Sequence, residues 1–205
     1  MRFTALWLSG IIVVVYALQQ LFSTEPFLLI SSLKFAEPWR LLTSVFSHGS
    51  PAHLLNNLFA LVLFGLILEG RIGPKRLLWL FLATGIIVNI FSPYPRSLGA
   101  SGAIYGILGA LVALRPMMVI WLQWMPMPMV VAGAVWLLQD VFGVFYPSGV
   151  ANLAHISGLF IGVAAGLYWR KRGYGDKIDA SAKIGKDTEL ERRLDDWERE
   201  HMLRK

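Results

Sequence analysis

A serine, two histidines and an asparagine lie in strongly apolar stretches of this chain, at Ser101, His155, His53 and Asn57. A serine hydroxyl is a weak nucleophile until a base accepts its proton, and an imidazole with an ordinary pKa of about 6.5 suits that task at neutral pH. If the fold brings Ser101 and His155 together, the pair can act as nucleophile and general base in acyl transfer.

The serine and the histidines also have simpler interpretations. A membrane serine beside glycines is often a packing residue, and His155 in a glycine-rich helix could form a helix–helix hydrogen bond. His48, His53 and His155 could bind zinc, but a pair five residues apart on a loop and a helix is poor ligand geometry, and no thiolate or carboxylate joins them. The chain has no cysteine, which excludes a cysteine protease and disulfides.

The composition divides the chain into an apolar body and a charged tail. The 205 residues are 56% hydrophobic, above the roughly 45–50% usual in soluble domains. Of the 13 acidic residues, nine lie between Asp176 and Glu200. We expect a cytoplasmic tail at residues 173–205, with an amphipathic helix over 189–203. The net charge of +6 is better explained by a membrane than by nucleic acid.

A membrane helix needs about 20 apolar residues, with a range of roughly 17–25. The sequence predicts an all-α, six-helix membrane bundle in one domain, residues 1–172. The first apolar stretch is too long for a signal peptide and lacks a cleavage site. Residues 117–128 are expected to be an interfacial segment, because tryptophans suit the headgroup level and prolines break helices. The six predicted spans are residues 3–22, 51–68, 77–92, 99–114, 129–146 and 150–169.

The basic residues predict the orientation of these spans. Six spans place both termini on one side, and that side has eight lysines and arginines against three on the other. Positive residues favour the cytoplasmic side, so both termini should be cytoplasmic. Within this set, residues 170–172 (RKR) should contact lipid phosphate.

The second, fourth and sixth spans all begin on the outer side, and each has its polar residues within about two turns of that end. These residues therefore lie roughly 3–10 Å below the helix ends. Small residues line one face of residues 99–114, and Gly158, Gly162 and Gly166 line the face of the sixth span that carries His155. Such faces let helix backbones approach closely, which could bring Ser101 within hydrogen-bond reach of His155.

Five motifs in this order resemble the rhomboid family and cover residues 39–169. They are residues 39–40 (WR), 53–57 (HLLNN), 69–73 (EGRIG), 99–106 (GASGAIYG) and 154–162 (AHISGLFIG).

The resemblance implies a rhomboid-type intramembrane serine endopeptidase with a minimal six-helix core. It would use a Ser101–His155 dyad with no required acidic member, metal or cofactor. The resemblance also implies an oxyanion site formed by the Ser101 backbone N–H and the side chains of His53 and Asn57. Supporting roles are expected for Tyr105, which would orient the imidazole, for His48, which would buttress His53, and for Gly99.

The resemblance further implies single-pass membrane proteins as substrates, cut near the outer face of a prokaryotic cell membrane. They would enter past the second and fifth spans, where Trp136 and Phe142 are candidate gate residues. Asp140 is expected to lie deeper than the dyad, with a structural or gating role. Two alternatives are a non-catalytic rhomboid-like binder and a transporter, although the polar residues cluster near one face, unlike a midplane transport site.

Overall fold

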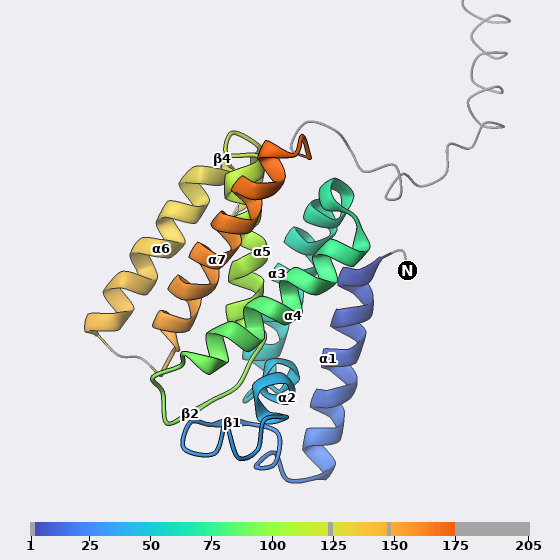
Figure 1. Ribbon diagram of the computed structural model, residues 1–205, viewed down its shortest axis with the longest axis vertical. Coiled ribbons are helices and arrows are strands. Elements are labelled where there is room, and N and C mark those ends of the chain that lie inside the picture. The colour runs from blue at the N-terminus through green and yellow to red at the C-terminus, as the bar shows by residue number, and fades with distance from the viewer. Residues whose placement is uncertain (1–2, 123–124, 147–148, 175–205) are drawn as a thin grey trace, which may run out of the picture.

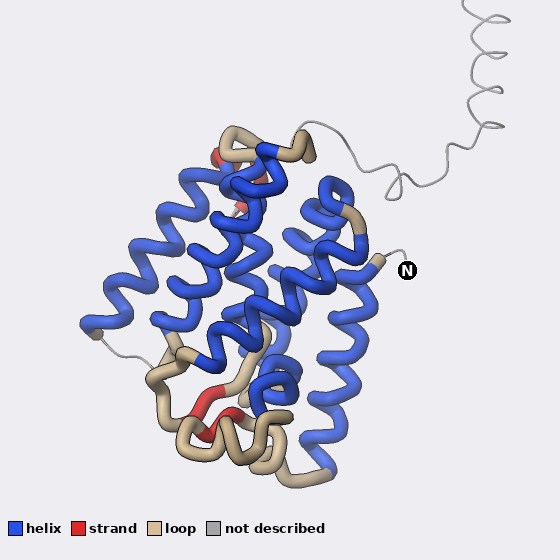
Figure 2. The backbone as a smooth tube through the Cα atoms, in the orientation of Figure 1, coloured by secondary structure: helices blue, strands red, loops and turns tan. Residues whose placement is uncertain are grey.

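The computed structural model describes residues 3–122, 125–146 and 149–174, and this part of the chain is mainly helical (Figure 1). Two short antiparallel pairs join the helices: β1 (Leu29–Ile30) with β2 (Arg96–Ser97), and β3 (Val119–Leu122) with β4 (Met125–Pro128) (Figure 2). The helices are α1 (Thr4–Leu21), α2 (Arg40–Phe46), α3 (Pro51–Ile72), α4 (Pro74–Ile90), α5 (Ser101–Leu114), α6 (Met129–Phe145) and α7 (Asn152–Lys171).

Each of the six predicted spans corresponds to one long helix, with ends that differ by up to four residues. By length and hydropathy, α1, α3 and α7 could each cross a membrane, while α5 and α6 are shorter apolar helices. That all six cross remains a prediction. The fourth span was expected to begin at Gly99, but its helix begins at Ser101. The short helix α2 and the pair β1–β2 were not predicted.

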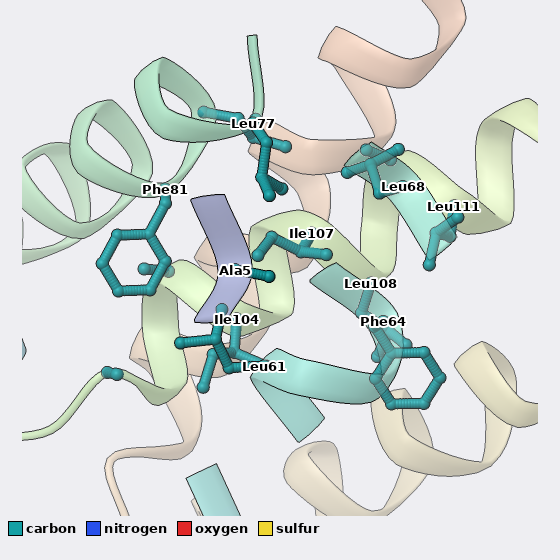
Figure 3. Packing of buried hydrophobic residues seen from close by; sticks show 14 of the residues in the cluster. Ala5, Leu61, Phe64, Leu68, Leu77, Phe81, Ile104, Ile107, Leu108 and Leu111 are labelled. Atoms are coloured by element: carbon teal, nitrogen blue, oxygen red, sulfur yellow. The ribbon is translucent and has the colours of Figure 1, made fainter. Parts of the chain in front are cut away.

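The core of the bundle is α5, in which 11 of 14 residues are buried. Its apolar side chains, including Ile104, Ile107 and Leu111, meet those of α1, α3 and α4, such as Leu61 and Phe81 (Figure 3). Large apolar residues on the outward faces of the other helices are exposed. This distribution suits a protein whose outer surface contacts lipid.

Glycines of α7 allow this helix to pack directly against the backbone of α5. A Cβ added to Gly158 would lie 2.1 Å from the Gly102 carbonyl oxygen, and one added to Gly162 would lie 1.9 Å from that of Gly106. On the opposite side of the contact, a Cβ at Gly109 would lie 2.1 Å from the Leu159 carbonyl oxygen. The predicted close approach of these two helices through small residues is therefore confirmed.

Two motif residues tie distant segments to this bundle. The buried Glu69 carboxylate accepts hydrogen bonds from the backbone N–H groups of Thr4 (2.9 Å) and Ala5 (3.1 Å), which caps the start of α1. The buried Arg40 guanidinium donates to the Leu28 carbonyl at 2.9 Å and also pairs with Glu37. Arg40 therefore holds the long loop between α1 and α2 against the bundle.

The segment expected at the membrane interface contains β3 and β4, which pair antiparallel with Val119 opposite Pro128. The described residues of this β3–β4 hairpin are non-helical, as the two prolines predict, but the strand pairing was not foreseen. Trp124 and the tail at 175–205 lie outside the described residues. In Figure 1 this hairpin, the α3–α4 turn and the end of α7 gather at one end of the molecule, and β1, β2 and α2 lie at the other.

Candidate active site

Ser101 and His155 meet at the end of the bundle where α5 and α7 both begin. Ser101 is the first residue of α5, and His155 is the fourth of α7. The Ser101 hydroxyl oxygen lies 2.8 Å from His155 Nε2, which is hydrogen-bond distance. The glycine contacts between α5 and α7 produce this approach, so the alcohol and the imidazole can exchange a proton.

Gly99 sets the entry of the chain into α5. Its φ of 123° is a conformation that residues with a Cβ rarely adopt. A Cβ at this position would also lie 2.6 Å from the His53 ring. The Gly99 N–H donates to the Ser44 carbonyl at 2.8 Å, which anchors the turn to α2. Gly99 is therefore required for both the turn and the contact with His53.

The Tyr105 ring lies parallel to the His155 imidazole. The ring centroids are 4.3 Å apart and the planes differ by 10°. Tyr105 is four residues after Ser101 and thus one turn along the same face of α5. The stacking confirms the predicted contact and fixes the plane of the imidazole.

The His53 ring lies beside the turn at Gly99 that precedes Ser101, and the His48 ring packs against His53. The two rings pack edge to face with centroids 4.9 Å apart. His48 is 2% exposed, and its backbone N–H donates to the Gln19 side chain. Burial, together with the neighbouring His53, lowers the pKa of His48 to about 4. His48 is therefore a neutral residue at pH 7, and the expected buttressing contact is present.

Asn57 is buried one turn after His53 on α3. Its side-chain Nδ2 donates to the His53 carbonyl at 3.1 Å. A primary amide has two N–H donors, so the second remains for another acceptor. His53 contacts Gly99, while Asn57 lies farther along α3 on the same side of that helix.

Asp140 is the largest departure from the sequence analysis. It was expected below the dyad, yet its Oδ1 lies 2.8 Å from His155 Nδ1. Gly143 of α6 packs against Asn152 at the start of α7. Asp140 and His155 each lie three residues farther into their helices from this contact, so the two side chains share one depth. The predicted depth was therefore wrong.

Two polar residues that support the turn at Gly99, Asn89 and Ser44, were not predicted from the sequence. The Asn89 side chain donates to the Leu41 carbonyl and to the Ser44 hydroxyl, both at 2.9 Å. Ser44 in turn accepts the Gly99 N–H. The available signal was an asparagine within the otherwise apolar residues 77–92, and it could have identified Asn89 as a positioned residue.

A small cavity of about 20 Å³ lies beside Ser101, lined also by Gly99, Ser97 and Ala154. This volume is sufficient for a water molecule. One contiguous cluster therefore comes from α3, α5, α6, α7 and the turn before α5. Its members are Ser101, His155, Tyr105, Asp140, His53 and Gly99.

Comparison with known families identifies the family of this chain. The model of the rhomboid domain matches residues 36–172, which is more than half of the chain. The chain belongs to the rhomboid family. This rhomboid is therefore an integral membrane protein, in agreement with its apolar helices.

Several relatives of this rhomboid carry the names of proteases, and others are named only as rhomboid-like proteins. Rhomboid protease GluP of Bacillus subtilis is 50% identical over 80 residues, 37% of this chain and 16% of the relative. Rhomboid protease GlpG of Klebsiella pneumoniae is 33% identical over 180 residues, 79% of this chain and 63% of the relative. RHOMBOID-like protein 6 of Arabidopsis thaliana is 30% identical over 135 residues, 64% of this chain and 43% of the relative. The chain thus spans less than two thirds of each.

Proposed function

We propose that this rhomboid is an intramembrane serine endopeptidase that cleaves single-pass membrane proteins near the outer face, with Ser101 as nucleophile and His155 as general base. The observation that carries the proposal is the 2.8 Å contact between the Ser101 hydroxyl and His155 Nε2. If Ser101 were only a helix-packing residue, its contact with an imidazole that also stacks against Tyr105 would have no explanation.

The geometry suits acyl transfer in two steps. Ser101 Oγ attacks the peptide carbonyl carbon while His155 Nε2 takes the hydroxyl proton. The C–N bond then breaks, the proton passes to the leaving amine, and an ester to Ser101 remains. Water next attacks the ester carbonyl, with His155 again taking a proton and returning it to Ser101 Oγ.

The negative oxygen formed in each step needs hydrogen-bond donors. The Ser101 backbone N–H is a candidate, because amides in the first turn of a helix lack intrahelical partners and the helix dipole favours negative charge there. The His53 ring contacts Gly99, two residues before the nucleophile, and the second Asn57 N–H could join it. We assign these three donors to the oxyanion.

Substrate entry between α3 and α6 fits the same proposal. Phe64 of α3 and Trp136 of α6 pack edge to face with centroids 5.6 Å apart. Phe142 of α6 is exposed. Separation of one aromatic pair would open a lateral route from the membrane. Trp136 and Phe142 are therefore proposed gate residues.

The orientation proposal agrees with the architecture. The end of the molecule with the α3–α4 turn and the end of α7 carries residues 71, 75, 76 and 170–172, all basic (Figure 1). The site lies toward the opposite end, where α5 and α7 begin. With the basic end in the cytoplasm, Ser101 lies nearer the outer face, as cleavage there requires.

The function is tested with purified protein in lipid vesicles and a single-pass substrate. The substrate has a small residue before a helix-breaking segment near its outer end, because a helix must unwind to expose its carbonyls. Mass spectrometry should locate one cut after that small residue. A matched substrate with leucines in place of the helix-breaking residues should be cut more slowly. Binding without any cleavage would instead favour the non-catalytic binder.

Asn57→Ala should lower kcat by up to about 10²–10³, with KM nearly unchanged, because an oxyanion donor acts mainly in the transition state. The matched control is Asn56→Ala, since Asn56 is the exposed neighbour on the same helix. Steady-state kinetics with the vesicle substrate separates the two parameters. If kcat is unchanged while KM rises, Asn57 binds substrate and does not stabilise the oxyanion.

A further inference from the structure

The His155 imidazole has hydrogen-bond partners on both ring nitrogens. Nε2 faces the Ser101 hydroxyl and Nδ1 faces Asp140 Oδ1, each at 2.8 Å. For Nε2 to accept the serine proton, the ring proton must be on Nδ1, and a carboxylate is an acceptor for that N–H. The resemblance to rhomboids implies a dyad with no acidic member, so this contact is an addition.

We propose that Asp140 is a positioning residue that holds His155 in the tautomer and orientation needed for proton transfer from Ser101. The inference rests on the proposed protease function. Asp140 acts through His155 and does not touch the substrate. It also faces the positive charge that His155 acquires when it takes the serine proton, and an adjacent carboxylate stabilises that charge.

The placement of Asp140 favours this role over an incidental contact. It is 4% exposed, in a helix whose other buried residues, Met129, Ala132 and Gly133, all lie in its first two turns. Its second oxygen, Oδ2, makes no hydrogen bond within the described residues, and the Tyr105 side chain also interacts with this carboxylate. A buried carboxylate is costly in an apolar bundle, and the hydrogen bond with His155 Nδ1 offsets part of that cost.

The Tyr105 ring complements this contact. Stacking at 4.3 Å fixes the imidazole plane but permits rotation of the ring within that plane. The Asp140 hydrogen bond removes the remaining rotation, because it fixes the direction of Nδ1. The two contacts together aim Nε2 at Ser101.

A structural role must be separated from a positioning role, since Asp140 also joins α6 to α7. The two helices have a second contact nearby, where a Cβ at Gly143 would lie 2.5 Å from the Asn152 side chain. We therefore expect the helix pair to stay folded without the carboxylate. The two roles are distinguished by measuring kcat, KM and thermal stability of the same variant. A positioning role predicts a lower kcat with KM and thermal stability nearly unchanged.

The test compares wild type, Asp140→Asn, Asp140→Glu and the control Gln139→Ala, an exposed neighbour on α6. Asp140→Asn should lower kcat at least tenfold, with KM within about twofold, because an amide can hold the wrong tautomer. Asp140→Glu should recover part of the rate by restoring the carboxylate, and Gln139→Ala should match wild type.

Wild-type kcat in folded Asp140→Asn, or a glutamate variant no faster than the asparagine variant, would overturn the inference. A rate loss fully explained by a lower folded fraction in the thermal unfolding curve would overturn it as well. Failure of the wild type to cleave would instead reject the protease function, so the two failures are distinguishable.

Discussion

Removing either Ser101 or His155 should abolish nearly all cleavage, and removing both should reduce it little further. The two side chains form one hydrogen-bonded unit at 2.8 Å, and neither can promote acyl transfer alone. Losses in members of a catalytic unit are not additive, because the first substitution already removes the shared function. For a serine protease the loss amounts to about 10⁴–10⁶ in kcat.

The measurement is kcat for Ser101→Ala, His155→Ala and the double variant on the vesicle substrate. His155→Ala leaves the buried Asp140 without its partner, so the second variant is His155→Gln, which supplies an amide N–H as a hydrogen-bond donor. Thermal unfolding must show that each variant is folded. Appreciable cleavage by folded Ser101→Ala would reject the serine mechanism. If both His155 variants cleave while Ser101→Ala does not, a residue other than His155 acts as the base.

Gly162→Ala should be among the most damaging single-methyl substitutions in this protein. Its Cβ would lie 1.9 Å from the Gly106 carbonyl oxygen, and that backbone group cannot rotate away as a side chain can. Helices α5 and α7 must then separate, which raises the Ser101–His155 distance. We expect a stability loss of at least about 1–3 kcal/mol, typical of overpacking, together with a near-complete loss of activity.

Gly10→Ala is the matched control, because Gly10 lies in α1 with nothing within 4 Å of an added Cβ. It should be neutral or stabilising by up to about 1 kcal/mol, the helix preference of alanine over glycine. Thermal unfolding in detergent and cleavage kinetics measure both effects. If Gly162→Ala unfolds and cleaves like Gly10→Ala, close packing of these helices does not position the dyad.

The positions of the long helices could be predicted because local sequence patterns identify membrane-spanning helices. A backbone that crosses lipid must satisfy its hydrogen bonds internally, so long apolar stretches mark helices. The contact of Ser101 with His155 could be predicted for a similar reason: spaced glycines such as Gly158 and Gly162 identify the face on which α7 packs. Predictions from the sequence therefore match the structure best for contacts that depend on the residues along one face of a single helix.

Asp140 could not be placed in this way, because its depth depends on how far α6 extends past the start of α7. An offset of about 3 Å, two residues of rise, decides whether Asp140 lies below His155 or beside it. No local pattern sets that offset. The same limit applies to β1 and β2, which are two residues long each and pair across a separation of more than 60 residues.

Labelling by a fluorophosphonate probe shows whether Ser101 is an activated nucleophile, because the probe reacts with a serine only when a base activates it. Purified protein in detergent is treated with the probe, digested and analysed by mass spectrometry. If His155 activates Ser101, we expect one labelled serine, Ser101, and little labelling in folded His155→Gln. Absence of label on Ser101 in folded wild type, or equal labelling in His155→Gln, would contradict that activation.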